Sequence, residues 1–245
     1  MGLLSIGGVK LGLSPKIVGV ISDKDVPAIS KDKSLLDYAD ILEVRIDMFK
    51  DRSPEYLRRI LSDVKRLSGK PLIATVRDVR EGGRPPAMGD DLRFSLFKSA
   101  LPFVDAADIE IRAAKELVKK VVSLFKKNKK VVIGSYHDFR KTPDAKKLKE
   151  ILLRSKTLGC DILKIAAYAR TRDELARLSV FTVMEKKKNN IVTISMGDRG
   201  LISRIFNPMV GSLFTYGYVN RPVFKGQGSV KDIAGLLAEF DPAYR

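Results

Sequence analysis

Short aliphatic runs alternate with longer amphipathic segments from residue 16 to residue 240 of the 245-residue chain, and this alternation restricts the possible folds most strongly. Eight of the runs have the length of buried strands and are bounded by turn residues. Most are continuously aliphatic, which is typical of parallel strands that are covered on both faces. The predicted strands are residues 16–22, 41–47, 72–77, 108–112, 131–136, 162–167, 191–195 and 213–218.

The segments between these runs have the periodicity of helices that bury one face. Residues 54–67 begin behind Ser53, which can cap a helix, and repeat apolar side chains every three or four positions. Similar stripes occur in residues 117–125 and 230–237. Eight strand-and-helix units favour a closed parallel barrel, because an open doubly wound sheet usually has fewer strands and a glycine-rich turn after the first. The sequence therefore predicts an α/β fold, a (β/α)8 TIM barrel, as a single domain over residues 1–245.

Two segments lie outside the alternation. Residues 1–13 fit a short hairpin that covers the floor of the barrel. Residues 81–90 are rich in glycine and proline and are too long for a tight connection. We therefore expect the second segment to be a functional loop.

Cysteine content and hydropathy bear on the location of the protein. Cys160 is the only cysteine, so the chain cannot form an internal disulfide, and the first residues are too interrupted by glycine for the apolar core of a signal peptide. No stretch approaches the roughly 18 consecutive apolar residues of a membrane-spanning helix. We expect a cytoplasmic protein that is not inserted in a membrane.

A net charge of +17 raises the alternative of a nucleic-acid-binding protein, because a basic field attracts polyanions as well as small anions. The densest lysine runs, residues 126–130 and 186–188, fall at the predicted C-terminal ends of helices, where cations interact favourably with the helix dipole. They are not interleaved with aromatic side chains that would stack on bases. We therefore expect no specific nucleic acid partner.

Polar side chains gather where the predicted strands end, and the carboxyl ends of barrel strands carry the active sites of this fold. Lys164 stands inside an aliphatic run, so its ammonium group must point into the barrel. Burial lowers the pKa of a lysine and produces an amine that can form an imine with a ketone. The alternative is a structural lysine that pairs with a barrel carboxylate such as Glu43 or Glu110.

His137 is the only histidine, and it follows the preceding predicted strand at the same end of the barrel as Lys164. An imidazole at this position could transfer protons near neutral pH, whereas a histidine in a surface loop is the alternative. One histidine and one cysteine are too few for the usual ligand set of a zinc site, so we expect no metal.

Three arginines near strand or helix ends offer planar guanidinium groups that suit a carboxylate or a phosphate, namely Arg45, Arg77 and Arg204. Each could equally form a structural ion pair with an acid nearby. Gln227 is flanked by two glycines, which permit a tight loop over the mouth of the barrel. The set favours a small anionic substrate.

In chain order, six motifs resemble those of the type I 3-dehydroquinate dehydratases of the shikimate pathway. The resemblance covers nearly the whole chain, and the motif around the histidine is the most specific. The motifs are Glu-Val-Arg-Ile-Asp at 43–47, Arg-Asp-Val-Arg-Glu-Gly-Gly at 77–83, Ser-Tyr-His-Asp-Phe at 135–139 with Lys-Thr-Pro at 141–143, Lys-Ile-Ala at 164–166, Ser-Met-Gly at 195–197 with Gly200, Ser203 and Arg204, and Gly-Gln at 226–227.

The resemblance implies a hydro-lyase that converts 3-dehydroquinate to 3-dehydroshikimate in aromatic amino acid biosynthesis, with no metal or organic cofactor. It implies that Lys164 forms a Schiff base with the substrate, that His137 is the general acid and base, and that Glu81 orients His137. It also implies a homodimer. The residues implied to hold the hydroxyl and carboxylate groups of the substrate are Glu43, Arg45, Arg77, Arg204 and Gln227.

Two residues depart from the pattern of the family that the chain resembles. Val223 stands where a hydroxyl residue is common, so one hydrogen bond from the closing loop to the substrate is expected to be absent. Tyr216 stands where phenylalanine is common. A class I aldolase is the nearest enzymatic alternative, because it is also a barrel with a strand lysine, but the order of the motifs favours the dehydratase.

Overall fold

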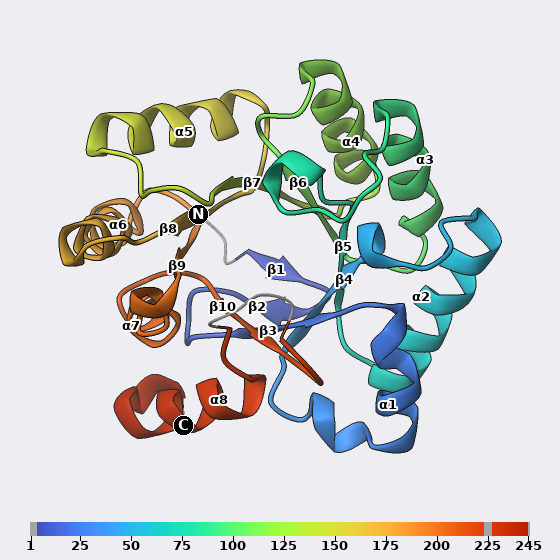
Figure 1. Ribbon diagram of the computed structural model, residues 1–245, viewed down its shortest axis with the longest axis horizontal. Helices are drawn as coiled ribbons and strands as arrows, with labels where there is room; N and C mark the ends of the chain where they lie inside the picture. Colours follow the sequence, from blue (N-terminus) through green and yellow to red (C-terminus); the bar gives the residue numbers. More distant parts are fainter. Residues whose placement is uncertain (1–3, 223–226, 245) are drawn as a thin grey trace.

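The computed structural model describes residues 4–222 and 227–244, and in this part of the chain eight parallel strands form a nearly closed barrel inside a ring of helices (Figure 1). The hydrogen-bonded ladder follows the order β10-β3-β4-β5-β6-β7-β8-β9. At the seam between β9 and β10, the Leu213 amide donates to the Ile191 carbonyl at 2.9 Å. The strands are β3 (Ile17–Ile21), β4 (Ile41–Arg45), β5 (Leu72–Thr75), β6 (Ala106–Glu110), β7 (Val131–Asp138), β8 (Ile162–Tyr168), β9 (Ile191–Met196) and β10 (Thr215–Tyr218).

The helices of the described residues follow the strands in the alternation that the sequence predicts. They are α1 (Val26–Lys31), α2 (Pro54–Ser68), α3 (Asp90–Ala100), α4 (Lys115–Lys127), α5 (Ala145–Thr157), α6 (Arg172–Glu185), α7 (Ser203–Met209) and α8 (Val230–Phe240). Shorter 3₁₀ turns occupy Asp23–Asp25, Lys33–Leu36, Ile46–Met48, Val79–Glu81, Asp198–Gly200 and Pro242–Tyr244. Within residues 4–222 and 227–244, no helix has the length and hydropathy required to cross a bilayer.

Helix α2 illustrates how local sequence sets the bounds of these elements. The Ser53 side chain accepts a hydrogen bond from the Tyr56 amide, and Pro54 occupies the first helical position. The helix ends at Gly69, which has the left-handed conformation that glycine adopts without steric cost. The Ser53 cap therefore acts as predicted, and Gly69 ends the helix one residue beyond the predicted range.

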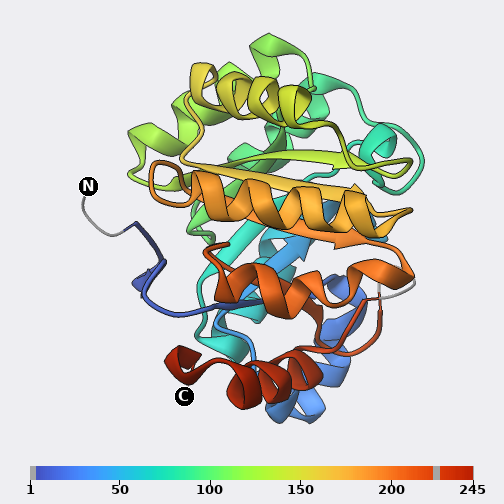
Figure 2. The same ribbon diagram turned by 90° about the vertical axis from the view of Figure 1, so that its left-hand side faces the viewer.

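An N-terminal hairpin closes one end of the barrel, as the sequence predicts. Strand β1 (Ser5–Ile6) pairs with β2 (Val9–Lys10) in antiparallel register. Ile6 is fully buried and packs in one cluster with Val18 and Ile41, which lie early in their strands. The hairpin thus covers the amino-terminal end of the barrel and leaves the opposite end for the functional loops (Figure 2).

Every strand differs from its predicted range by one or two residues at an end, and two of these differences affect the site. Strand β6 begins and ends two residues before the predicted range 108–112, because the Ala113 amide bonds to the Glu110 carbonyl and turns the chain there. Strand β7 continues to Asp138, because His137 and Asp138 pair with Ala166 and Ala167 of β8. His137 therefore belongs to the strand itself.

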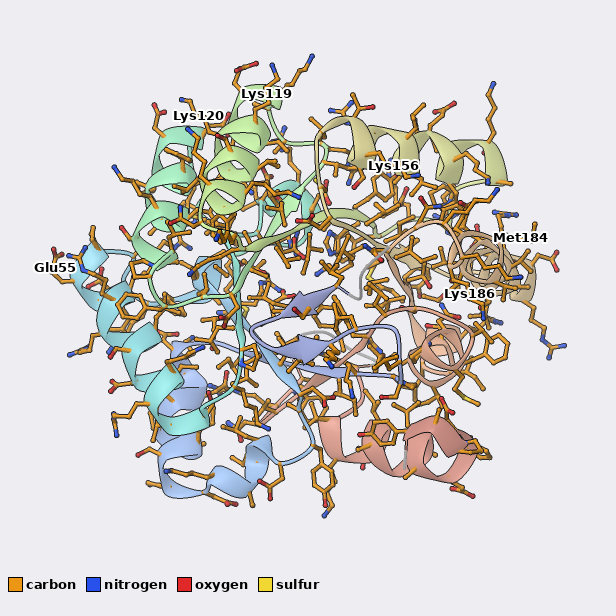
Figure 3. The ribbon with its side chains drawn as sticks, turned by 180° about the vertical axis from the view of Figure 1, so that it is seen from behind. Glu55, Lys119, Lys120, Lys156, Met184 and Lys186 are labelled. Atoms are coloured by element: carbon orange, nitrogen blue, oxygen red, sulfur yellow. The ribbon has the colours of Figure 1, made fainter. Side chains whose placement is uncertain are left out.

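The two lysine runs follow the ends of α4 and α6, as predicted. Lys126 forms an ion pair with Asp161, and the Lys130 ammonium donates to the carbonyl oxygens of Leu101 and Val104. Other lysines, such as Lys119 on α4, point away from the barrel (Figure 3). Part of the basic charge therefore stabilises the connections between helices and strands.

Glycine is required at position 83, in the loop that follows β5. A Cβ atom on Gly83 would lie 2.1 Å from the carbonyl oxygen of Arg77, which is a severe steric overlap with the backbone. We expect Gly83→Ala to lower the free energy of unfolding by about 1–3 kcal/mol, because the loop must move to accept the methyl group. Chemical denaturation measures this change.

Gly89 provides the control, because a Cβ atom there would meet no atom within 4 Å and its φ of −66° suits any residue. We expect Gly89→Ala to change the free energy of unfolding by less than about 0.5 kcal/mol. Equal stabilities of the two variants would mean that the loop moves aside without cost.

Candidate active site

The alternation of side chains along each strand decides which residues enter the barrel. In β8, Ile162 and Ala166 belong to the interior cluster, whereas Leu163 and Ile165 pack outward against the helices. Lys164 has the interior parity, and Ser135 of β7 is its neighbour in the register. The same parity turns Glu43 of β4 inward.

A single cavity at the carboxyl ends of the strands, about 80 Å³ in volume, brings the predicted site residues together. Val20, Phe139, Ala166, Ile194, Met196 and Tyr216 complete its lining. The eight residues predicted from the sequence all line it: Lys164, His137, Glu81, Glu43, Arg45, Arg77, Arg204 and Gln227. Val223 lies outside the described residues, and so does most of the loop at 224–228.

The Lys164 amine is buried, with 3% of the residue exposed, and it lies among three oxygen atoms. Its Nζ is 2.5 Å from Asp108 Oδ2, 3.3 Å from Glu43 Oε2 and 3.3 Å from the Tyr216 hydroxyl. The predicted structural alternative named Glu43 or Glu110 as the partner of Lys164. Glu43 is a partner, whereas Glu110 forms its ion pairs with Arg77 and Arg93.

Asp108 is a central residue of the site that the sequence analysis missed. Its Oδ1 accepts from the Ser135 hydroxyl at 2.6 Å and lies 2.9 Å from the Arg77 guanidinium. Burial raises the pKa of Asp108, but the cations Arg77 and Lys164 outweigh burial, so that the pKa is lowered. The predicted strand began at residue 108 and so put Asp108 at the amino-terminal end of the barrel, whereas β6 begins at Ala106 and places Asp108 in the middle of the strand, level with the cavity residues.

His137 faces the same cavity and is bound to Glu81. Its Nδ1 lies 3.0 Å from Glu81 Oε2, and its backbone amide donates to the same oxygen at 2.9 Å. Burial lowers the pKa of His137 well below its ordinary value, and the cations Arg77 and Lys164 lower it further. The imidazole is therefore neutral at pH 7, and Nε2 is the nitrogen left to act on a bound molecule.

Arg45 and Arg77 form structural ion pairs and also line the cavity, so the two alternatives predicted for them hold together. Arg45 binds Asp47 through two hydrogen bonds of 2.8 Å, and Arg77 donates to Glu110 at 2.9 Å and to Ser135 at 2.7 Å. Both guanidinium groups still line the cavity. They are held rigidly by acids and can present remaining donors to a ligand.

Arg204, at the start of α7, has a different environment. It donates to the Tyr216 carbonyl at 2.9 Å, and within the described residues it has no carboxylate partner. Burial lowers its pKa to about 10, so the guanidinium remains charged at pH 7. A buried cation without a counter-ion is suited to bind an anion, such as the carboxylate of a substrate.

Tyr216 stands where phenylalanine is common in the family that the chain resembles, so its hydroxyl group is the difference. Burial raises the pKa of Tyr216 well above its ordinary value, and the charge of Glu43 raises it further, so the phenol stays neutral. Its ring centroid lies 4.5 Å from Lys164 Nζ. The extra hydroxyl is thus a neutral hydrogen-bonding group beside the lysine amine.

Comparison with known proteins agrees with this geometry. The model of the family described as type I 3-dehydroquinase matches residues 18–241. A 3-dehydroquinate dehydratase of Thermodesulfovibrio yellowstonii is 36% identical over 91% of this chain and 94% of that protein. One of Methanocella arvoryzae is 36% identical over 87% of this chain and 91% of its own.

Solved structures give the same result for the fold. The crystal structure of the type I 3-dehydroquinate dehydratase of Clostridium difficile, with covalently modified comenic acid, superimposes with a TM-score of 0.87 at 30% identity and covers 97% of both chains. That of the 3-dehydroquinate dehydratase of Aquifex aeolicus has a TM-score of 0.81 at 31% identity, covering 93% of this chain and 99% of the other. The chain therefore belongs to the type I 3-dehydroquinase family.

Proposed function

We propose that the chain is a 3-dehydroquinate dehydratase, a hydro-lyase that forms a Schiff base on Lys164 and removes water from 3-dehydroquinate to give 3-dehydroshikimate. The reaction belongs to the shikimate pathway of aromatic amino acid biosynthesis. One observation carries the proposal: a buried lysine amine opens into the same cavity as the only imidazole of the chain. That cavity also contains Arg204, a cation that can bind the carboxylate of an acidic substrate.

The first chemical step joins Lys164 to the C3 ketone. Glu43 lies close enough to accept a proton from the ammonium group, which frees the amine for attack on the carbonyl carbon, while Asp108 stays a carboxylate. The ketone oxygen leaves as water, and the product is a protonated iminium. The iminium draws electrons from C2, so the scheme needs no metal or organic cofactor.

The second step is the elimination of water, in which His137 handles both protons. The neutral imidazole removes a proton from C2, and the enamine that forms expels the C1 hydroxyl group. His137 then returns a proton to the leaving oxygen. Glu81 bonds to Nδ1 and orients the ring, and hydrolysis of the iminium releases 3-dehydroshikimate and restores Lys164.

Substrate binding is assigned to the charged and amide side chains that line the cavity around Lys164 and His137. Arg204 is assigned to the substrate carboxylate, because it has charge and no acidic partner in the described part of the chain. Glu43, Arg45 and Arg77 are assigned to the hydroxyl groups, and Gln227 to a contact from the closing loop.

We also propose a homodimer, supported by an apolar surface on α6 and α7, which pack side by side (Figure 2). In a chain with a net charge of +17, an apolar surface is where two copies meet with least repulsion. The α6–α7 apolar surface consists of side chains that are 37–69% exposed: Val180, Val183, Met184, Leu201, Ile202, Phe206 and Met209.

Residues 1–245 are proposed to act as one catalytic domain, and the cytoplasm is proposed as its location. The single cysteine, Cys160, supports a reducing compartment, because the chain uses no internal disulfide for its stability.

Reductive trapping tests the proposed chemistry. Incubation of the enzyme with 3-dehydroquinate and borohydride should add the mass of the reduced substrate or product to the peptide that contains Lys164. Lys164→Ala should neither be trapped nor turn over substrate, because it lacks the amine. His137→Ala should still be trapped but turn over about 10²–10⁴ times more slowly. Trapping by sugar phosphates in place of 3-dehydroquinate would instead support an aldolase.

The role of Arg204 predicts an effect on substrate binding. We expect Arg204→Met to raise KM by about 10- to 100-fold with little change in kcat, because a charged hydrogen bond to the carboxylate is lost in ground state and transition state alike. Arg199→Met is the control, since Arg199 is exposed in the preceding turn and does not line the cavity. A fall in kcat at constant KM would move Arg204 from binding to the chemical step.

The homodimer predicts a response to charge on the α6–α7 apolar surface. We expect Val180→Lys combined with Val183→Lys to convert a dimer to a monomer in sedimentation velocity, because two copies would bring like charges together. Leu153→Lys is the matched control, because Leu153 is 66% exposed on α5, away from this surface. A wild-type monomer, or a double variant that stays dimeric, would refute the proposed interface.

A further inference from the structure

We propose that Arg112 is a positioning residue that fixes the Glu81 carboxylate relative to the His137 ring, an inference that rests on the proposed function. Arg112 follows β6 by two residues and does not line the cavity. Its Nε donates to Glu81 Oε1 at 2.7 Å, and its Nη2 donates to the carbonyl oxygen of His137 at 2.6 Å. One guanidinium group thus binds both members of the pair.

The order of the strands explains why such a bridge is needed. Glu81 lies in the turn after β5, and His137 lies near the end of β7, so the two belong to strands that are not neighbours in the sheet. Strand β6 runs between them, and Arg112 extends from the end of β6. Arg112 therefore links the turn after β5 to the end of β7, two segments that no backbone ladder joins directly.

Glu81 is held from both sides as a result. Its Oε2 receives the amide and the ring of His137, and its Oε1 receives Arg112. The carboxylate is 4% exposed, so an ionic partner greatly reduces the cost of keeping it charged. An ionised Glu81 keeps the proton on Nδ1 of His137, which leaves Nε2 free to accept a proton from the substrate.

Arg112 is itself held in one orientation. Its guanidinium carbon lies 4.5 Å from the ring centroid of Tyr136, which packs outward from β7. The Arg112 side chain is 44% exposed, so its charge keeps part of its hydration. This combination of two hydrogen bonds and a ring contact is specific to the planar fork of arginine, and lysine can reproduce the charge but not the geometry.

The test compares Arg112→Met and Arg112→Lys with the wild type, using 3-dehydroquinate as substrate. For Arg112→Met we expect kcat to fall about 10- to 100-fold with KM within about twofold, because Arg112 acts on the base and not on the substrate. Borohydride trapping on Lys164 should persist, because the contacts of that amine do not involve Arg112.

The pH profile separates positioning from simple structural support. Loss of the Arg112 cation beside the Glu81–His137 pair favours protonation of His137, so the acid limb of kcat/KM should move to higher pH by about one unit in Arg112→Met. In Arg112→Lys the acid limb of kcat/KM should return to its wild-type pH, while kcat stays below the wild-type value. Within the described residues, the charged groups that act on His137 and remain in these variants are Glu81, Arg77, Lys164, Asp108 and Arg45.

Lys115→Met is the matched control. Lys115 lines the groove between α4 and α5 together with Arg112, and its substitution removes the same positive charge. The inference is overturned if Arg112→Met behaves like Lys115→Met in kcat and in the acid limb. It is also overturned if Arg112→Met lowers only Tm. A wild-type protein that does not turn over 3-dehydroquinate would instead refute the proposed function.

Discussion

The ion pairs of Asp108 with Lys164 and Arg77 are the interaction on which the rest of the site depends. Two cations this deep inside a barrel would repel each other in a medium of low dielectric constant, and the buried carboxylate between them offsets that repulsion. The network continues outward, because Arg77 binds Glu110 and Glu110 binds Arg93 of α3. The position of the lysine amine is therefore coupled to the helical layer.

The charge of this network is conserved through the proposed reaction. An ammonium group and a protonated iminium both carry one positive charge, so Asp108 keeps a cationic partner when Lys164 becomes bonded to substrate. Asp108 therefore keeps its negative charge, and its contact with the lysine nitrogen, through the reaction. The proton transfers of the elimination step fall on His137, whose neutral ring lies in a second network with Glu81 and Arg112.

The two networks show how one cavity can keep a lysine paired with carboxylates and a histidine uncharged. The cations Arg77 and Lys164 lower the pKa of both Asp108 and His137, so each group is favoured in its deprotonated form. For His137, burial acts in the same direction, whereas for Asp108 it acts in the opposite one. The result is a carboxylate that can accept hydrogen bonds and an imidazole that can accept a proton.

The sequence by itself predicted the barrel and eight of the fourteen described residues that line the cavity, because strand parity and helix caps are local properties and the site motifs resemble those of a known family. It did not reveal Asp108, since a shift of two residues moves this side chain from the start of the strand to its middle, about 7 Å nearer the cavity. Nor did it reveal Arg93, an arginine in an amphipathic helix that is 1% exposed. Only the tertiary structure decided these partners and the link from Arg112 to Glu81, because ion pairs between residues far apart in the chain depend on strand order and register, which local periodicity does not encode.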